Sequence, residues 1–207
     1  TGVDENIAQE RAPADGAPVP EFMPVLLSLN CGHRLSAAVG LRAAQQNGLF
    51  LEQYLAQPIE QLIGQACGHP VNRTGVVEIG NLVATHRGAS QLLFILLSLI
   101  LAQAGFQWVA FTATVQVQKN ISRLGIQTHY LADADPRHMA PEKLQAWGSY
   151  YDSRPRVIVA EMAGNMENLQ QQRLIQYLSV SYRHRLSELA GFINYPNDLN
   201  DTSVIAA

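Results

Sequence analysis

Residues 76–114 read VVEIGNLVATHRGASQLLFILLSLILAQAGFQWVAFTAT, and this stretch decides the fold. Apolar and β-branched residues over Val76–Ala84 and again over residues 108–114 predict two strands. Residues 89–104, which lie between them, are apolar on nearly every face and end at Gly105. This pattern predicts a helix that is buried on most of its sides, because a helix at the surface needs a polar face.

The flanking sequence extends this unit into a mixed sheet. An antiparallel hairpin is predicted over residues 21–44, and residues 49–51 are expected to end a strand. Pro58 is placed to open a short helix, because proline is well tolerated at the first helical position. Three further elements follow: a helix over residues 115–124, a strand over 128–134 and a strand over 157–162. This order predicts an α/β (α+β) fold, a mixed twisted sheet flanked by helices.

Two segments lie outside the predicted core of residues 21–163. Residues 1–20 have no sustained apolar periodicity and are expected to form a flexible lead-in. Within residues 164–207, apolar side chains recur at four-residue spacing over 166–189, which predicts one amphipathic helix before a loose tail. Its polar face carries few basic residues, so at most peripheral contact with a membrane is expected. For this helix, packing on the protein's own core or pairing with a second copy in a homodimer is favoured over membrane binding.

Composition narrows the class of protein. The 207 residues are 47% apolar and 15% charged, which is typical of a globular protein. A net charge of −3 argues against nucleic-acid binding, since no basic field is present to displace counterions from phosphates. The longest apolar run, residues 92–102, is too short to cross a bilayer about 30 Å thick, so a cytoplasmic location is expected. The histidines are dispersed, and no metal site is predicted.

The loop before the central helix has features of a phosphate-binding site. Backbone N–H groups and the positive end of a helix dipole favour an anion at the start of a helix, here at Ala89 and Ser90. Gly88 lets a ligand approach the backbone closely, and Arg87 adds a charge-assisted contact. Many α/β proteins place a glycine at a helix start for the turn alone, so this pattern needs independent support.

That support comes from a family resemblance. The order strand, glycine loop, apolar helix, strand and short helix resembles the acyl-CoA-binding half of the GNAT superfamily. Ile121 occupies the position at which many GNAT enzymes have a proton-donating tyrosine. Residues 78–82 (EIGNL) are similar to a strand of the acyl-homoserine-lactone synthases. The closer resemblance is to the thermostable hemolysin family, through residues 51–55 (LEQYL), 58–60 (PIE), 77–82 (VEIGNL), 111–114 (FTAT) and 147–152 (WGSYYD).

This resemblance implies a GNAT-like N-acyltransferase. Such an enzyme moves a fatty acyl group from acyl-CoA, or from the phosphopantetheine of an acyl carrier protein, to a small-molecule amine. The resemblance also implies that a backbone N–H near Val83 meets the thioester carbonyl. A GNAT fold begins with a strand and two helices ahead of the hairpin, and residues 1–20 are too short and too polar to supply them. Either part of the chain precedes this sequence, or the fold is shorter on that side.

Two carboxylates are candidates for the catalytic base. Glu78 lies inside an apolar strand beside the expected cofactor cleft, and a carboxylate in that setting is costly unless it is paired or used. It is expected to act as a base or to bind the acceptor amine. A salt bridge to a residue such as Arg42 is an equally weighted alternative. Glu52 lies in another apolar run and has the same two interpretations.

Polar residues on other elements complete the predicted site. Tyr151 is the candidate for the proton that Ile121 has no group to supply, although an aromatic core patch with its neighbours is the competing interpretation. Thr112 and Thr114 alternate with apolar residues, so both hydroxyls are expected on one face of a strand, where they contact the substrate together with Asn81. The alternative function is a membrane-active or partner-binding protein that uses the C-terminal helix on a non-catalytic scaffold.

Overall fold

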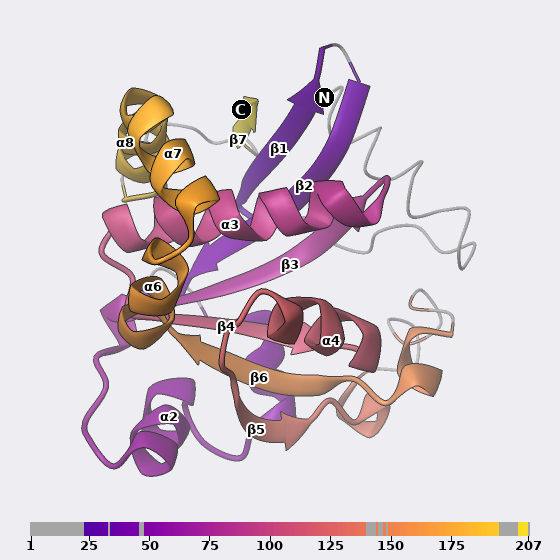
Figure 1. Ribbon diagram of the computed structural model, residues 1–207. Helices are drawn as coiled ribbons and strands as arrows, with labels where there is room; N and C mark the ends of the chain where they lie inside the picture. The colour runs from indigo at the N-terminus through magenta and orange to yellow at the C-terminus, as the bar shows by residue number, and fades with distance from the viewer. Residues whose placement is uncertain are drawn as a thin grey trace.

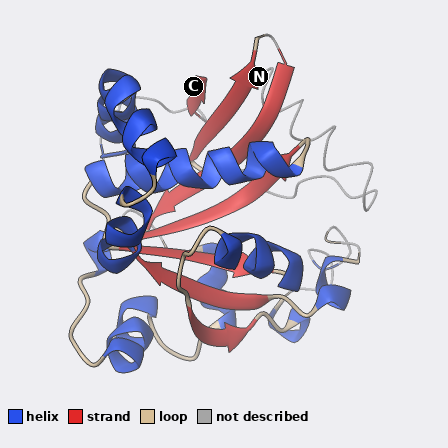
Figure 2. Cartoon of the chain, in the orientation of Figure 1, coloured by secondary structure: helices blue, strands red, loops and turns tan. Residues whose placement is uncertain are grey.

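The computed structural model describes residues 23–32, 34–45, 48–139, 144, 147, 149–194 and 203–206. Its centre is a seven-stranded sheet in the order β5-β6-β4-β3-β2-β1-β7. Helices cover both faces of this sheet (Figures 1 and 2). The predicted mixed α/β fold is therefore confirmed, whereas the predicted lead-in of residues 1–20 lies outside the described residues.

The sheet combines antiparallel hairpins with one central parallel pair. Strand β3 pairs in parallel with β4, and β7 in parallel with β1, while the remaining neighbours are antiparallel. A parallel pair needs a crossover connection, and α3 provides it between β3 and β4. The strands are β1 (Val25–Cys31), β2 (Arg34–Ala43), β3 (Val76–Ala84), β4 (Trp108–Ala113), β5 (His129–Asp133), β6 (Arg156–Glu161) and β7 (Ser203–Ala206).

The crossover helix organises the core on one face. Helix α3 lies across β1, β2 and β3 in Figure 1, and α8 and α6 pack against it. Its buried residues join Val77, Ile79 and Phe111 of the sheet in one apolar cluster. Each fully buried side chain of this size contributes about 2 kcal/mol. The helices are α2 (Ile59–Cys67), α3 (Arg87–Gln103), α4 (Val115–Arg123), α6 (Met162–Gln170), α7 (Arg173–Ser181) and α8 (Arg183–Asn194).

The other face of the sheet is covered by a smaller apolar cluster. Short 3-10 helices η1 (Phe50–Tyr54) and η4 (Tyr150–Ser153) contribute to it, together with α2. Leu51, Ile59 and Ile63 are fully buried there against Val76 of β3. Pro58 is the N-cap of α2, as its predicted place at the helix start implies.

Three predictions about local structure are wrong. Residues 203–206, expected in a loose tail, form β7 and pair with β1. Residues 49–51 do not end a strand but lead into η1, because carboxylates from Glu52 and Glu78 accept the N–H groups that a strand would pair. The single helix over residues 166–189 is divided among α6, α7 and α8. A straight helix of that length would span about 36 Å, whereas α3 has 17 residues and spans about 25 Å. By turning back, the chain packs buried side chains of α6, α7 and α8 into the same apolar cluster as α3.

The C-terminal helices are part of the core. Leu178 of α7 and Leu186, Leu189 and Ile193 of α8 are buried in the same cluster as α3. The favoured packing of the C-terminal segment on its own core is what the structure shows. None of the described helices combines the length and apolarity required to span a bilayer.

Candidate functional site

The two central parallel strands separate to form a fork. Pairing between β3 and β4 runs from Val76 and Trp108 to Ile79 and Phe111, and beyond this last pair the strands diverge (Figure 1). The cause lies on the other edge of β3, where the register with β2 shifts by one residue. At this bulge Asn81 has φ +47°, and a bulge increases local twist, which turns the end of β3 away from β4.

A cavity of about 180 Å³ occupies this fork. Of the predicted substrate and catalytic residues, Glu78, Asn81, Thr112 and Thr114 all line it. The side-chain oxygen of Asn81 accepts the N–H of Met23 at 3.0 Å, which draws the segment before β1 over the cavity. The hydroxyl of Thr114 accepts the N–H of Val117 at 3.4 Å and so begins α4 at the same place.

Glu78 is the most unusual group in the cavity. Its side chain is 2% exposed, and its two oxygens accept the N–H groups of Phe50 at 2.8 Å and Leu51 at 3.0 Å. Burial raises the pKa of Glu78 to about 7, although both hydrogen bonds and the charge of Arg42 act in the opposite direction. Arg42 stands opposite Glu78 in the register of β2 and β3 and lines the same cavity. Its charge acts on Glu78, but burial is the larger effect.

Glu52 lies outside the lining of this cavity and has a full set of partners. Its oxygens accept two hydrogen bonds from Arg73, at 2.6 and 2.8 Å, and one each from the N–H groups of Leu49 and Ile59. The hydrogen bond from Arg73 is the main cause that lowers the pKa of Glu52 to about 2. A permanently charged carboxylate with four donors is suited to joining η1 to α2, and not to accepting a proton from a substrate.

The aromatic residues divide into a lining layer and a layer behind it. Phe50, Tyr54, Trp147 and Tyr150 line the cavity. The hydroxyl of Tyr151 is hydrogen-bonded to the hydroxyl of Tyr54, and burial raises the pKa of Tyr151. The indole N–H of Trp147 is buried and has no hydrogen-bond partner within the described part of the chain. A buried donor of this kind is available to a ligand oxygen.

The predicted phosphate loop begins α3 two residues earlier than expected. His86 is the N-cap, and its ring nitrogen accepts the N–H of Ala89 at 3.1 Å. Ala89 and Ser90 are buried, whereas Gly88 is exposed, and a Cβ at Gly88 would lie 3.3 Å from the His86 ring. The side chain of Arg87 lies outside the described residues. The N-terminal end of α3 and the open end of the fork are on the same side of the molecule (Figure 1).

Val83, near which the thioester carbonyl was expected, does not line the cavity. Val83 is buried with Leu26 and Ala38 in a small cluster of its own. Gly80, Asn81 and Leu82 line the cavity instead. These residues lie beyond the last β3–β4 pair, so their peptide groups border the fork.

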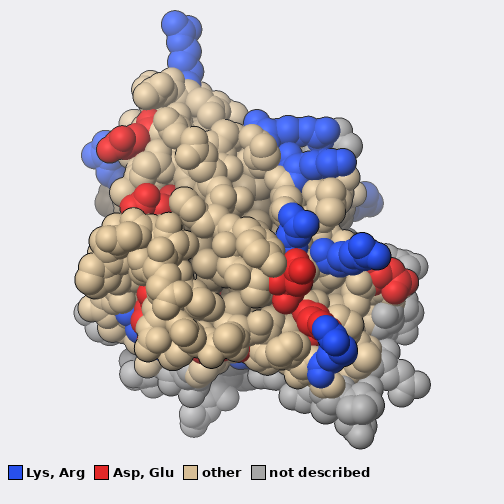
Figure 3. Space-filling view, turned by 90° about the horizontal axis from the view of Figure 1, so that it is seen from below, with Lys and Arg blue, Asp and Glu red and all other residues tan. Residues whose placement is uncertain are grey.

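One face of the molecule, seen from below in Figure 3, carries charges of both signs. On the face seen from below, most side chains are uncharged, and the Lys and Arg on one side lie beside Asp and Glu (Figure 3). Among the described residues, no three His, Cys, Asp or Glu side chains are grouped so that they could hold a metal ion. The cavity therefore presents a polar side at Glu78 and Arg42 and an apolar side toward α3.

Comparison with known proteins identifies the family. A family model described as thermostable hemolysin matches residues 3–166. The chain belongs to the thermostable hemolysin family. The matched residues of this family member include the whole fork and end before α7 and α8. A search of curated proteins found no match.

Solved structures similar to this thermostable hemolysin family member include three named synthases. TofI in an apo form is 13% identical, with a TM-score of 0.48 over 72% of this chain and 73% of TofI. The acyl-homoserine-lactone synthase LasI is 12% identical, with a TM-score of 0.42 over 62% of this chain and 59% of LasI. BjaI, a CoA-dependent acyl-homoserine lactone synthase solved with SAM and isopentyl-CoA, is 9% identical, with a TM-score of 0.42 over 86% of this chain and 65% of BjaI.

Sequence reasoning missed several residues of this family member's site. Met23, Phe50, Tyr54 and Phe94 line the cavity; they come from the segment before β1, from η1 and from α3. Apolar and aromatic residues are common in any core, so no local pattern marks them as site residues. The one available signal was the run 50–55, in which aromatic residues flank Glu52.

Proposed function

We propose that this protein is an acyltransferase that moves a fatty acyl group from a thioester to an amine within the fork between β3 and β4. The observation that carries this proposal is Glu78, a buried carboxylate whose pKa is near 7 and which lines a cavity between diverging parallel strands. A general base is most effective when its pKa lies close to the working pH. The resemblance of residues 78–82 to the acyl-homoserine-lactone synthases supports the same chemistry.

The donor arm occupies the fork in this proposal. A pantetheine arm has amide groups that pair with an unpaired strand edge, and β3 offers one beyond Ile79. The thioester carbonyl is placed against the backbone of Gly80, Asn81 and Leu82, just ahead of Val83. The phosphates of acyl-CoA or of an acyl carrier protein lie toward Gly88 and Ser90 at the positive end of α3, and a contact from Arg87 stays a prediction.

Glu78 moves one proton through the reaction. The nitrogen lone pair of the amine attacks the thioester carbon, and Glu78 takes the proton that the nitrogen loses. As the tetrahedral intermediate collapses, the carbon–sulfur bond breaks, and protonated Glu78 returns the proton to the sulfur. A carboxylic acid with a pKa near 7 is a stronger acid than a thiol of pKa about 8.5, so this return is favourable. Tyr151, whose pKa is raised, holds its proton more tightly and is not assigned this step.

Direct assay tests the proposal. The protein is incubated with fatty acyl-CoA or acyl carrier protein and a panel of small amines, and free thiol and N-acyl product are measured. We expect stoichiometric thiol and amide with at least one amine. The assignment would be contradicted if no donor bound to the protein and no donor released thiol.

The pH dependence of the rate tests Glu78 specifically. Glu78 accepts a proton only when ionised, and its pKa is raised from 4.5 to about 7. We therefore expect kcat/KM to rise about tenfold per pH unit below 7 and to level off above it. The profile is measured between pH 5 and 9 with an amine whose own pKa lies outside that range. A profile that is flat between pH 5.5 and 8 would exclude Glu78 as the base.

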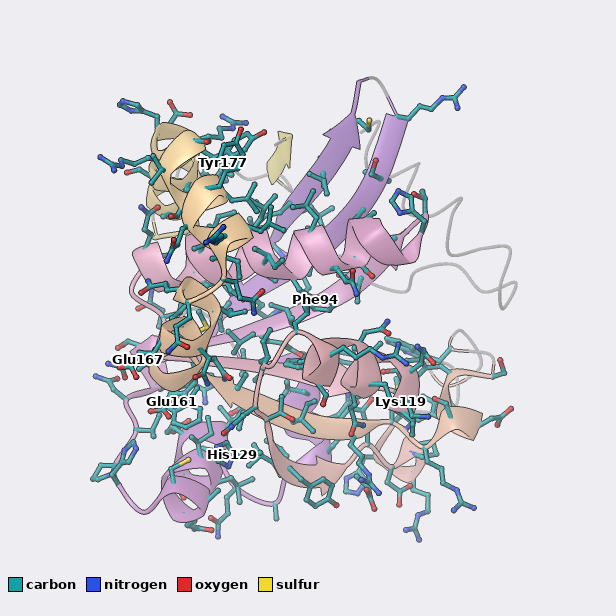
Figure 4. The ribbon with its side chains drawn as sticks, in the orientation of Figure 1. Phe94, Lys119, His129, Glu161, Glu167 and Tyr177 are labelled. Atoms are coloured by element: carbon teal, nitrogen blue, oxygen red, sulfur yellow. The ribbon has the colours of Figure 1, made fainter. Side chains whose placement is uncertain are left out.

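One surface supports a second candidate function, a partner-binding role for the C-terminal helices. Of the six large hydrophobic side chains that are exposed within the described residues, four lie between residues 174 and 182. They are Leu174, Tyr177, Val180 and Tyr182, each at least 51% exposed. Tyr177 projects outward from α7 in Figure 4. Such clustering is typical of a contact surface for a second copy of the chain or for a membrane.

Paired serine substitutions separate the two functions. If α7 is a contact surface, Leu174→Ser with Tyr177→Ser is expected to weaken self-association or vesicle binding at least tenfold and to leave acyl transfer unchanged. Analytical ultracentrifugation and vesicle co-sedimentation measure the first effect, and thiol release measures the second. Val115→Ser with Tyr130→Ser changes two equally exposed side chains elsewhere and serves as the matched control. Association that is the same in all three proteins would remove α7 from this role.

A further inference from the structure

A second, smaller cavity lies behind the fork. It has a volume of about 40 Å³ and is bounded by the sheet and by α3, α4 and α6. Two of its lining residues are polar, and both are engaged in hydrogen bonds. Ser98 donates to the carbonyl of Phe94 at 2.8 Å, and Asn165 exchanges hydrogen bonds with the backbone of Gln127 at 2.7 and 2.9 Å. The free wall of this cavity is therefore apolar and suits a hydrocarbon chain.

Three side chains separate this apolar cavity from the fork cavity. Ile79, Phe94 and Phe111 line both spaces. Ile79 and Phe111 form the last β3–β4 pair, at the base of the fork. Phe94 comes from α3 and points toward the fork from above the sheet (Figure 4).

We propose that Phe94 limits the length of the acyl chain and that the apolar cavity behind it receives the chain end when this barrier is opened. The proposal rests on the proposed acyl transfer in the fork. An acyl chain attached to a thioester beside Gly80 and Asn81 reaches Phe94 when it extends along the α3 face of the sheet. Ile79 packs on this face with α3, whereas Glu78, its neighbour in β3, is held by η1 on the other face. The cavity of about 40 Å³ is little larger than the roughly 30 Å³ of one water molecule, so a long chain has no space beyond Phe94.

Phe94 is the member of the barrier that can be changed selectively. Ile79 and Phe111 are paired strand residues, and changing either alters the fork itself. Phe94 is 6% exposed and belongs to α3, outside both strands of the fork. Removing most of its ring would join the two cavities and add on the order of 100 Å³ of apolar space.

The test compares donor length in Phe94→Leu and Phe94→Ala with the wild-type protein. Binding is measured calorimetrically with a series of non-reactive S-alkyl-CoA probes from butyl to hexadecyl, and turnover with the matching acyl-CoA donors. Each methylene that gains a buried site contributes about fourfold in affinity. We expect the longest accommodated chain to increase by about two to four carbons and the affinity for those probes to rise tenfold or more. Butyl-CoA should bind almost equally to all variants.

Leu97→Ala is the matched control. Leu97 lines the apolar cavity but not the fork, so its removal enlarges the far space without opening the barrier. Its length profile should equal that of the wild-type protein. Phe94→Leu removes the ring that separates the two cavities but keeps a branched apolar side chain, so it preserves the test if Phe94→Ala does not fold.

The outcomes distinguish the two proposals. Probes that bind the wild-type and Phe94→Leu proteins with the same length profile overturn the role of Phe94 and leave acyl transfer intact. Probes that bind with a shifted profile, but without turnover of any acyl-CoA, support Phe94 and contradict the transferase assignment. Absence of probe binding at every length, together with no turnover of either acyl-CoA or acyl carrier protein, overturns both.

Discussion

Replacing Glu78 by glutamine is expected to lower the rate of acyl transfer by about 10²–10⁴-fold, the usual contribution of a general base. Glutamine has nearly the same shape but takes no proton at any pH in the working range. The pH dependence below 7 should disappear together with most of the rate. Affinity for a non-reactive S-alkyl-CoA probe should change by less than about threefold, because the fork backbone that we assign to the donor is untouched.

Glu167→Gln is the matched control for this variant. Glu167 is an exposed carboxylate on α6, far from the fork in Figure 4, and the same substitution there removes an equal charge. Its rate and pH profile should equal those of the wild-type protein. If Glu78→Gln retained more than a tenth of the wild-type rate, a different group would have to take the proton.

The second large effect is expected on stability. Arg73→Leu should lower the free energy of unfolding by about 2 kcal/mol at pH 7, because Glu52 and Glu60 both lose their cation. Breaking a fully buried pair costs more, but these side chains are 20–29% exposed, and water offsets part of the loss. The pKa of Glu52 is lowered to about 2, so this stabilisation is complete above about pH 4.5 and is lost as the pH falls toward 2. Urea unfolding of the wild-type and Arg73→Leu proteins is measured at pH 7 and pH 3. The difference between their free energies of unfolding should be much smaller at pH 3.

An exposed ion pair provides the comparison. Arg137 is hydrogen-bonded to Asp135, but its side chain is 88% exposed, and exposed pairs contribute little. Arg137→Leu should leave urea unfolding unchanged at both pH values. A loss of stability equal to that of Arg73→Leu would show that the partial burial of Arg73, Glu52 and Glu60, the Arg73 cluster, is unimportant.

The Arg73 cluster also supports the candidate base. Glu52, held by Arg73, accepts the N–H of Leu49, and the next two N–H groups along the chain, from Phe50 and Leu51, bind Glu78. A shift of η1 would therefore remove the donors that orient Glu78. Arg73→Leu is expected to lower kcat as well as stability, although Arg73 does not line the fork cavity.

Much of the fold was predictable because its signals are local. The bounds of β3 were predicted as the structure has them, and those of β2, β4, β5, β6 and α3 within about two residues, since alternation and continuous apolarity mark buried elements. By contrast, β1 begins at Val25 and not at residue 21, and β7 was not predicted. Glu78 stood out as a charge in an apolar strand, and Thr112 and Thr114 as alternating hydroxyls. All three line the fork cavity, as does Asn81. These features depend on residues close together in the chain.

The sequence by itself determined the mixed sheet, the buried crossover helix, the family and the carboxylate at the centre of the site. Tertiary structure alone decided the roles of the two glutamates: Glu52 is held by Arg73, 21 residues away, and Glu78 by the backbone of Phe50, 28 residues away. It also divided the predicted C-terminal helix into α6, α7 and α8 and placed Phe94 at the base of the fork. The physical reason is that periodicity records which side of an element is buried, whereas the partner it meets there depends on how distant segments pack together.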